Sequence, residues 1–124
     1  MGRIQGDLLE RTFELAVAIL RLARALPNNA QGWEVGRQLI RSGTSIGANV
    51  READHALTRA EFAHKCSIAR KEASETHYWL QLCQRTELLS GQHTVEAITE
   101  ADELLRILST VVKRTQERSA EVHD

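Results

Sequence analysis

The sequence is poor in the residues that favour strands, turns and covalent cross-links. Its 124 residues include one proline, seven glycines and two cysteines, and its aromatic residues are two Trp, one Tyr and two Phe. Strands favour β-branched and aromatic runs, so this composition predicts helices. The thiols of Cys66 and Cys83 lie among apolar neighbours and are expected to be buried and unlinked.

An excess of one charge and long apolar runs are also absent. The chain has 16 Lys+Arg against 17 Asp+Glu, which argues against a generic polyanion binder. No apolar run reaches the ~20 residues of a membrane helix, and no charged-then-apolar leader opens the sequence. We therefore expect a cytoplasmic protein without membrane contact, folded as a single domain over residues 1–124.

What the sequence does contain is four segments in which apolar residues recur at steps of three and four. These segments predict helices over residues 7–26, 33–55, 59–89 and 94–116. Asp7 is placed to cap the first helix, and Pro27 follows its end. Thr58 and Glu61 form a capping box for the third helix, which Ser90-Gly91 is expected to end. Short connections between four helices predict an all-α, antiparallel up-down four-helix bundle.

Three glycines, Gly36, Gly43 and Gly47, lie inside the second predicted helix. Each interior glycine costs about 1 kcal/mol relative to alanine. Close approach of another helix near Gly43 and Gly47 would explain them, and so would a kink at Ser42-Gly43. Both explanations are compatible with the sequence.

Polar residues share one face on each of the two middle helices. The two sets are Arg41, Ser45, Asn49 and Glu52 on the second helix, and Lys65, Glu72 and Glu75 on the third. If these faces meet, they form a buried network in which every charge needs a partner. The alternative is two solvated faces. Trp79 borders the third-helix set and is expected either to pack at the edge of the core or to anchor a subunit contact.

The run from Arg41 to Ala53 resembles the signature of the bacterial "four helix bundle protein" family. That family includes proteins encoded within intervening sequences of large-subunit ribosomal RNA genes, and the run is also similar to the accessory variability determinant of diversity-generating retroelements. The signature positions are occupied by Arg41, Ser45, Ile46, Asn49, Val50 and Glu52, while Ala53 replaces the usual glycine. A second patch of the family is matched by Phe62, Ile68, Ala69, Arg70 and Glu75.

The resemblance implies a homopentamer, shaped as a tapered barrel with a central channel, and no known enzymatic activity or cofactor. For the retroelement relatives it implies binding of nucleic acid and of a reverse transcriptase through a strongly basic surface. This chain departs from that pattern, because its net charge is −1. Its arginines could nevertheless gather at one end of a ring and contact RNA or DNA. The candidates are Arg11, Arg21, Arg24, Arg37 and Arg59.

Three functions remain compatible with these patterns. The favoured one is a non-enzymatic homo-oligomer that binds nucleic acid or assists a nucleic-acid enzyme. A protein–protein adaptor without nucleic-acid contact is the alternative. A small-molecule or metal-binding bundle would use Arg41, Asn49, Glu52, Glu72 and Glu75. The sequence contains no nucleophile elbow, phosphate-binding glycine loop or zinc-protease motif, and its five histidines lack familiar metal-ligand spacings. We therefore predict neither catalysis nor a metal site.

Overall fold

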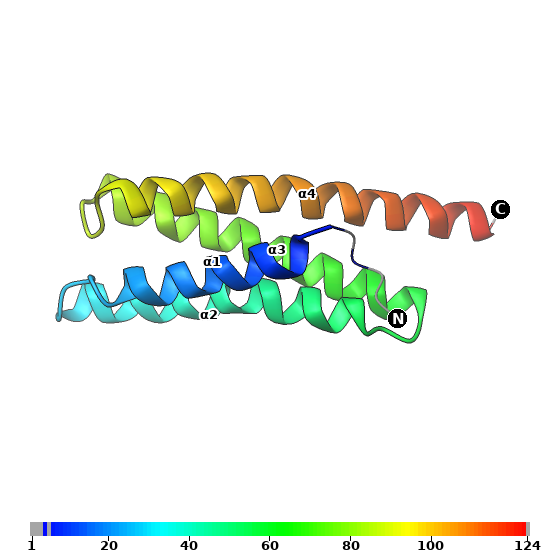
Figure 1. Cartoon of the computed structure of the whole chain (residues 1–124), viewed down its shortest axis with the longest axis horizontal. Helices are drawn as coiled ribbons and strands as arrows, with labels where there is room; N and C mark the ends of the chain where they lie inside the picture. The colour runs from blue at the N-terminus through cyan, green and yellow to red at the C-terminus, as the bar shows by residue number, and fades with distance from the viewer. Residues whose placement is uncertain (1–3, 5, 124) are drawn as a thin grey trace.

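The fold consists of four helices arranged as a bundle (Figure 1). The computed structural model describes residues 4 and 6–123, with side chains through residue 118 and at residue 120. The helices are α1 (Leu8–Ala23), α2 (Ala30–Asp54), α3 (Arg59–Arg85) and α4 (Gln92–His123). The part of the chain that is described contains no strand. The predicted all-α four-helix bundle is confirmed.

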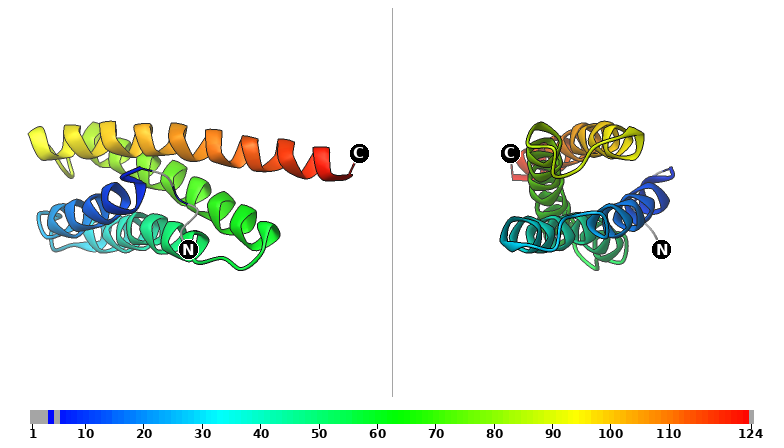
Figure 2. Two further views of the ribbon diagram at one scale, coloured as in Figure 1. Left: turned by 45° about the vertical axis from the view of Figure 1, so that its right-hand side comes forward. Right: turned by 90° about the vertical axis from the view of Figure 1, so that its left-hand side faces the viewer.

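The helices follow one another around the bundle in chain order. Each helix packs against the next, and α2 against α3 is the most extensive contact. The circuit closes where α1 meets α4, and that contact is much smaller than the other three. The end-on view of Figure 2 shows α1 and α4 diverging along one side of the bundle. The bundle is therefore closed on three sides and loosely held on the fourth.

The core is built from the apolar residues that recur at steps of three and four in every helix. Its largest fully buried aliphatic side chains are Ile19, Leu39, Ile46, Leu80, Leu104 and Leu108. Burying each such side chain stabilises the fold by about 1.5–3 kcal/mol. No helix in the described residues is both long enough and apolar enough to span a membrane.

Helix α1 approaches α2 closely over two of the interior glycines. A Cβ atom added at Gly43 would lie 2.8 Å from Cγ1 and Cγ2 of Ile19. One added at Gly47 would lie 3.3 Å from the carbonyl carbon and oxygen of Thr12. The predicted close approach of another helix to this surface is confirmed, and α1 is the helix that makes it.

Two helix boundaries near the first turn differ from the predicted ones. The first helix ends at Ala23, not at residue 26, because the backbone tightens into hydrogen bonds from Arg24 N–H to Arg21 O (3.3 Å) and from Ala25 N–H to Leu22 O (2.9 Å). The second begins at Ala30, not at residue 33, because the Asn29 side chain accepts a hydrogen bond from Gly32 N–H (2.9 Å).

The caps of the first and third helices also differ from the prediction in detail. Asp7 stands at the N-cap position of α1 but makes no side-chain cap hydrogen bond. The capping box of α3 forms: Thr58 Oγ1 accepts a hydrogen bond from Glu61 N–H (3.0 Å), and Glu61 Oε2 accepts one from Leu57 N–H (3.1 Å). The Glu61 carboxylate thus serves the amide one residue before the expected one.

The last two helices have boundaries that the turn residues alone did not reveal. The third helix ends at Arg85, not at residue 89, because Glu87 adopts a left-handed φ of 63°. Gly91, which was expected to stop it, instead precedes α4, where its carbonyl accepts a hydrogen bond from Val95 N–H (3.2 Å). Helix α4 continues past residue 116 to His123, since no Gly or Pro follows Gly91.

Candidate functional site

The polar faces of the two middle helices meet at a seam between α2 and α3. Arg41 from α2 donates hydrogen bonds to Glu72 Oε2 (3.0 Å) and to Glu75 Oε1, both on α3. Trp79 Nε1–H also donates to Glu75 Oε1 (3.2 Å). The hydrogen bond from Arg41 lowers the pKa of Glu75 below its usual range, with Trp79 adding to the effect. Two glutamates, one guanidinium and one indole therefore form a connected group.

This seam lies at the edge of the bundle and not within it. The side chain of Glu72 is 8% exposed, but that of Arg41 is 47% exposed. The sequence left two alternatives, a buried network next to Ile46 and Val50 and two solvated faces, and the seam lies between them. The polar face is rotated away from that buried stripe, so the long Arg41 side chain reaches inward to Glu72 from the surface.

The remaining members of the predicted set form a second, separate group. Lys65 Nζ on α3 lies 2.8 Å from Glu52 Oε1 on α2. The Ser45 hydroxyl donates to Arg41 O (2.6 Å), and Asn49 Nδ2 donates to Ser45 O (2.8 Å), so both side chains bond to their own helix. Within the described residues, no three or more His, Cys, Asp and Glu side chains are grouped to hold a metal ion.

The five arginines singled out in the sequence do not gather at one end of the molecule. Arg21, Arg24 and Arg37 lie near the α1–α2 turn, whereas Arg59 opens α3 at the opposite end (Figure 1). Arg11 donates hydrogen bonds to both carboxylate oxygens of Glu100, at 2.9 and 2.6 Å. A single chain therefore does not bring the five arginines to one end, and a shared rim in a ring stays a prediction.

Two of these five arginines already have acidic partners. Arg11 is held by Glu100 and lies 3.4 Å from Glu103, and Arg37 pairs with Glu34 at 3.0 Å on the surface. Among the residues described, no ion pair involves the other three, which are Arg21, Arg24 and Arg59.

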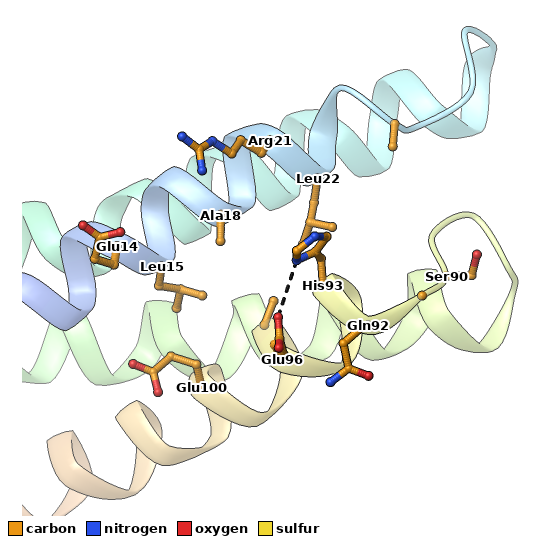
Figure 3. Close-up of a pocket in the computed structure, with 13 residues that line it drawn as sticks. Glu14, Leu15, Ala18, Arg21, Leu22, Ser90, Gln92, His93, Glu96 and Glu100 are labelled. Carbon is orange, nitrogen blue, oxygen red and sulfur yellow. Dashed lines mark ion pairs between the residues drawn. The ribbon is translucent and has the colours of Figure 1, made fainter.

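A groove that sequence reasoning missed lies between α1 and α4 (Figure 3). Its volume is about 530 Å³, and short or apolar side chains such as Leu15, Ala18 and Ala97 line its base. Helical spacing shows which residues share a face, but it does not show that two helices diverge. The alanines on both sides are the one sequence feature consistent with the space.

The rim of this α1–α4 groove is polar and mainly acidic. Figure 3 shows Glu14 and Arg21 on the α1 side and His93, Glu96 and Glu100 on the α4 side. His93 Nδ1 lies 3.4 Å from Glu96 Oε1. The lining therefore combines an apolar base with three carboxylates and one guanidinium.

A second surface missed by the sequence is an exposed apolar face along the outer side of α1 and α2. Phe13 and Leu20 on α1 are 52% and 45% exposed, and Trp33 and Ile40 on α2 are 64% and 38% exposed. Both pairs are spaced seven residues apart, so each pair lies on one side of its helix. Trp33 Nε1–H donates to Asn28 Oδ1 (2.8 Å), which fixes the ring at the surface. We call these four residues the α1–α2 face.

The comparisons with known proteins identify the family of this chain. Residues 5–110 match the family model of the 23S rRNA-intervening sequence protein. The chain belongs to this family. The match spans α1, α2, α3 and most of α4, including the seam between α2 and α3. The resemblance of Arg41–Ala53 to the family of intervening-sequence proteins is therefore confirmed.

A solved structure gives an independent comparison for this family member. The chain is 40% identical to a protein of unknown function from the S23 ribosomal protein family of Bacteroides thetaiotaomicron VPI-5482. The similarity covers 86% of this chain and 98% of that chain, with a TM-score of 0.78. No curated protein matches the sequence.

Proposed function

We propose that this 23S rRNA-intervening sequence family protein is a non-enzymatic homo-oligomer, a ring of five copies, that serves as a scaffold for nucleic acid. The exposed α1–α2 face is the observation that supports self-association. Soluble monomers rarely expose a contiguous group of large apolar side chains, and Trp, Tyr and Phe are enriched at subunit contacts. Phe13, Leu20, Trp33 and Ile40 are four large exposed apolar side chains on two helices that pack together, and Trp33 and Ile40 line one shallow hollow with Ala23 of α1.

In this proposal the α2–α3 seam has a structural role. Arg41 donates to both Glu72 and Glu75, and Trp79 donates to the Glu75 carboxylate as well. A saturated group of this kind fixes the register of two helices more readily than it performs acid–base chemistry, because the Glu75 carboxylate is held ionised. The seam then keeps α2 and α3 rigid beneath any contact made by the neighbouring surfaces.

Contact with nucleic acid would involve those of the five candidate arginines that have no acidic partner among the described residues. Arg21 and Arg24 at one end of the bundle and Arg59 at the other are exposed. A single chain of net charge −1 offers only a weak field, but a ring repeats every arginine in each copy. Several weak phosphate contacts on one rigid particle act together, so a modest patch becomes effective on a long polyanion.

The proposal has two separable tests. Multi-angle light scattering measures the number of chains in the particle, with five expected. Electrophoretic shift of structured RNA and duplex DNA over a salt series measures contact with nucleic acid. The variant Arg24→Ala/Arg59→Ala should weaken binding and reduce its salt dependence, while Arg37→Ala, whose partner is Glu34, should have a smaller effect.

A protein–protein adaptor is the second candidate function, and the near balance of charge favours it. An adaptor would still form an oligomer, but it would not cause a salt-sensitive electrophoretic shift of RNA or DNA. A monomer in solution contradicts the scaffold. An oligomer that leaves RNA and DNA unshifted at low salt contradicts the nucleic-acid role and supports the adaptor.

A further inference from the structure

We propose that the α1–α2 face of one copy seats in the α1–α4 groove of the next copy, so that the ring is built from one repeated, head-to-tail contact. This inference rests on the proposed self-association and names the two surfaces that carry it. Both surfaces include residues of α1, which face different sides of that helix.

The two surfaces match in shape and polarity. The α1–α2 face presents large apolar side chains outward, whereas the α1–α4 groove is a hollow of about 530 Å³ with an apolar base. Leu20 and Ile40 of one copy would lie against Ala18 and Leu22 of the next. Such a fit removes apolar area from water on both copies at once, which is the main source of association free energy.

The charges of the two surfaces are also complementary. The groove lining carries Glu14, Glu96 and Glu100 together with Arg21. Glu100 is already paired with Arg11, so Glu14 and Glu96 remain against Arg21. The α1–α2 face is flanked on α2 by Arg37 and Arg51, both exposed, with Glu34 as the partner of Arg37. An acidic groove therefore favours a surface flanked by Arg51 over a second groove, because like charges across a contact disfavour it.

The positions of the two surfaces around the bundle decide what kind of assembly results. They occupy neighbouring sides that share α1, because α1 packs against both α2 and α4. A contact between two different surfaces is heterologous, and each added copy is turned by the same amount relative to the one before. Surfaces on neighbouring sides of a bundle turn the row of copies, and the proposed contact requires a turn that closes the row into a ring and not an open filament.

The test uses two variants, each of which blocks one surface of the full chain. Leu20→Glu/Ile40→Glu places charges on the α1–α2 face, and Ala18→Arg fills the groove. Leu57→Glu and Ala60→Arg are matched controls at exposed positions outside both surfaces. Circular dichroism establishes that each variant is folded, and light scattering gives its mass. If Ala18→Arg fails to fold, the rim variant Glu14→Arg/Glu96→Arg replaces it.

We expect each blocked variant to be a monomer and each control to match the native particle. Mixing the two blocked variants in equal amounts should produce a particle of two chains and nothing larger, because one intact face and one intact groove remain. If the two blocked variants remain monomers after mixing, the proposal is overturned. Self-association would then use a two-fold contact or other surfaces.

The remaining outcomes separate this inference from the proposed function. If the native protein is a monomer, the proposed scaffold function is contradicted as well. A native oligomer whose mass is unchanged by both blocked variants leaves the scaffold in place and overturns only the choice of surfaces. If the face variant keeps the native mass but loses its shift of RNA, the α1–α2 face binds nucleic acid and not a second copy.

Discussion

Ile19 lies so close to Gly43 that no side chain fits between them. A Cβ atom at position 43 would be 2.8 Å from both Cγ atoms of Ile19, a side chain that is fully buried. Helix propensity favours alanine over glycine by about 1 kcal/mol, but overpacking a core costs about 1–3 kcal/mol. The clash outweighs the gain in helix propensity, because the γ carbons of a buried β-branched residue have little freedom to move.

Gly43→Ala is therefore expected to lower the free energy of unfolding by about 1 kcal/mol or more, measured by urea denaturation. Gly36→Ala is the matched control. There the nearest atom to the added Cβ is Leu26 Cδ1 at 3.2 Å, the flexible end of a side chain. The control should leave stability unchanged or slightly raised, and equal losses for the two variants would contradict the close α1–α2 approach.

Arg41→Met should destabilise the fold by about 1–3 kcal/mol, because the largely buried carboxylate of Glu72 loses its cationic partner. Arg37→Met removes an arginine of the same helix whose partner, Glu34, is exposed, so its expected effect is within about 0.5 kcal/mol. Chemical denaturation of both variants at neutral pH measures the difference. Equal free energies of unfolding for the two variants would show that the ion pairs of Arg41 in the α2–α3 seam do not stabilise the fold.

The stabilising effect of Arg41 should decrease in acid. Arg41 lowers the pKa of Glu75 from its ordinary value of 4.5, so the contribution is present above about pH 4.5 and lost as the pH falls through the lower, folded value. The difference in unfolding free energy between native protein and Arg41→Met should narrow below pH 4.5. If the protein also carries Glu75→Gln, the effect of Arg41→Met on the unfolding free energy should depend less on pH. An identical pH dependence of that effect with and without Glu75→Gln would exclude Glu75 as the titrating group.

The thiols should be unreactive in the folded protein. Burial raises the pKa of Cys66 to about 11 and also raises the pKa of Cys83, so little thiolate forms at pH 8. Labelling by a thiol-specific reagent should be slow until denaturant is added. Leu57→Cys supplies an exposed thiol in the same chain and should react at once. Rapid labelling of the native cysteines would contradict their burial.

The sequence predicted the helices well, because a core stripe requires apolar residues at steps of three and four. The two ion-paired groups between α2 and α3 also follow from residues that share a face. The five arginines do not gather at one end of the chain, because Arg59 opens α3 at the end opposite the α1–α2 turn. The ion pair of Arg11 was not predicted, because its carboxylate is 89 residues away along the chain. The α1–α4 groove was missed for a related reason. No turn joins these two helices, so the spacing of residues along the chain does not show how far apart they lie.

The one-sided attachment of α1 also has a consequence for the motions of the protein. Helix α1 is secured to α2 through Gly43 and Gly47 but has few contacts with α4. Its backbone amides should therefore exchange with deuterium before those of α3, through partial openings in which α1 lifts off while the other three helices stay folded. Any partner that bridges α1 and α4 would slow that exchange. Deuterium exchange of the α1 amides would therefore show whether the α1–α4 groove is occupied.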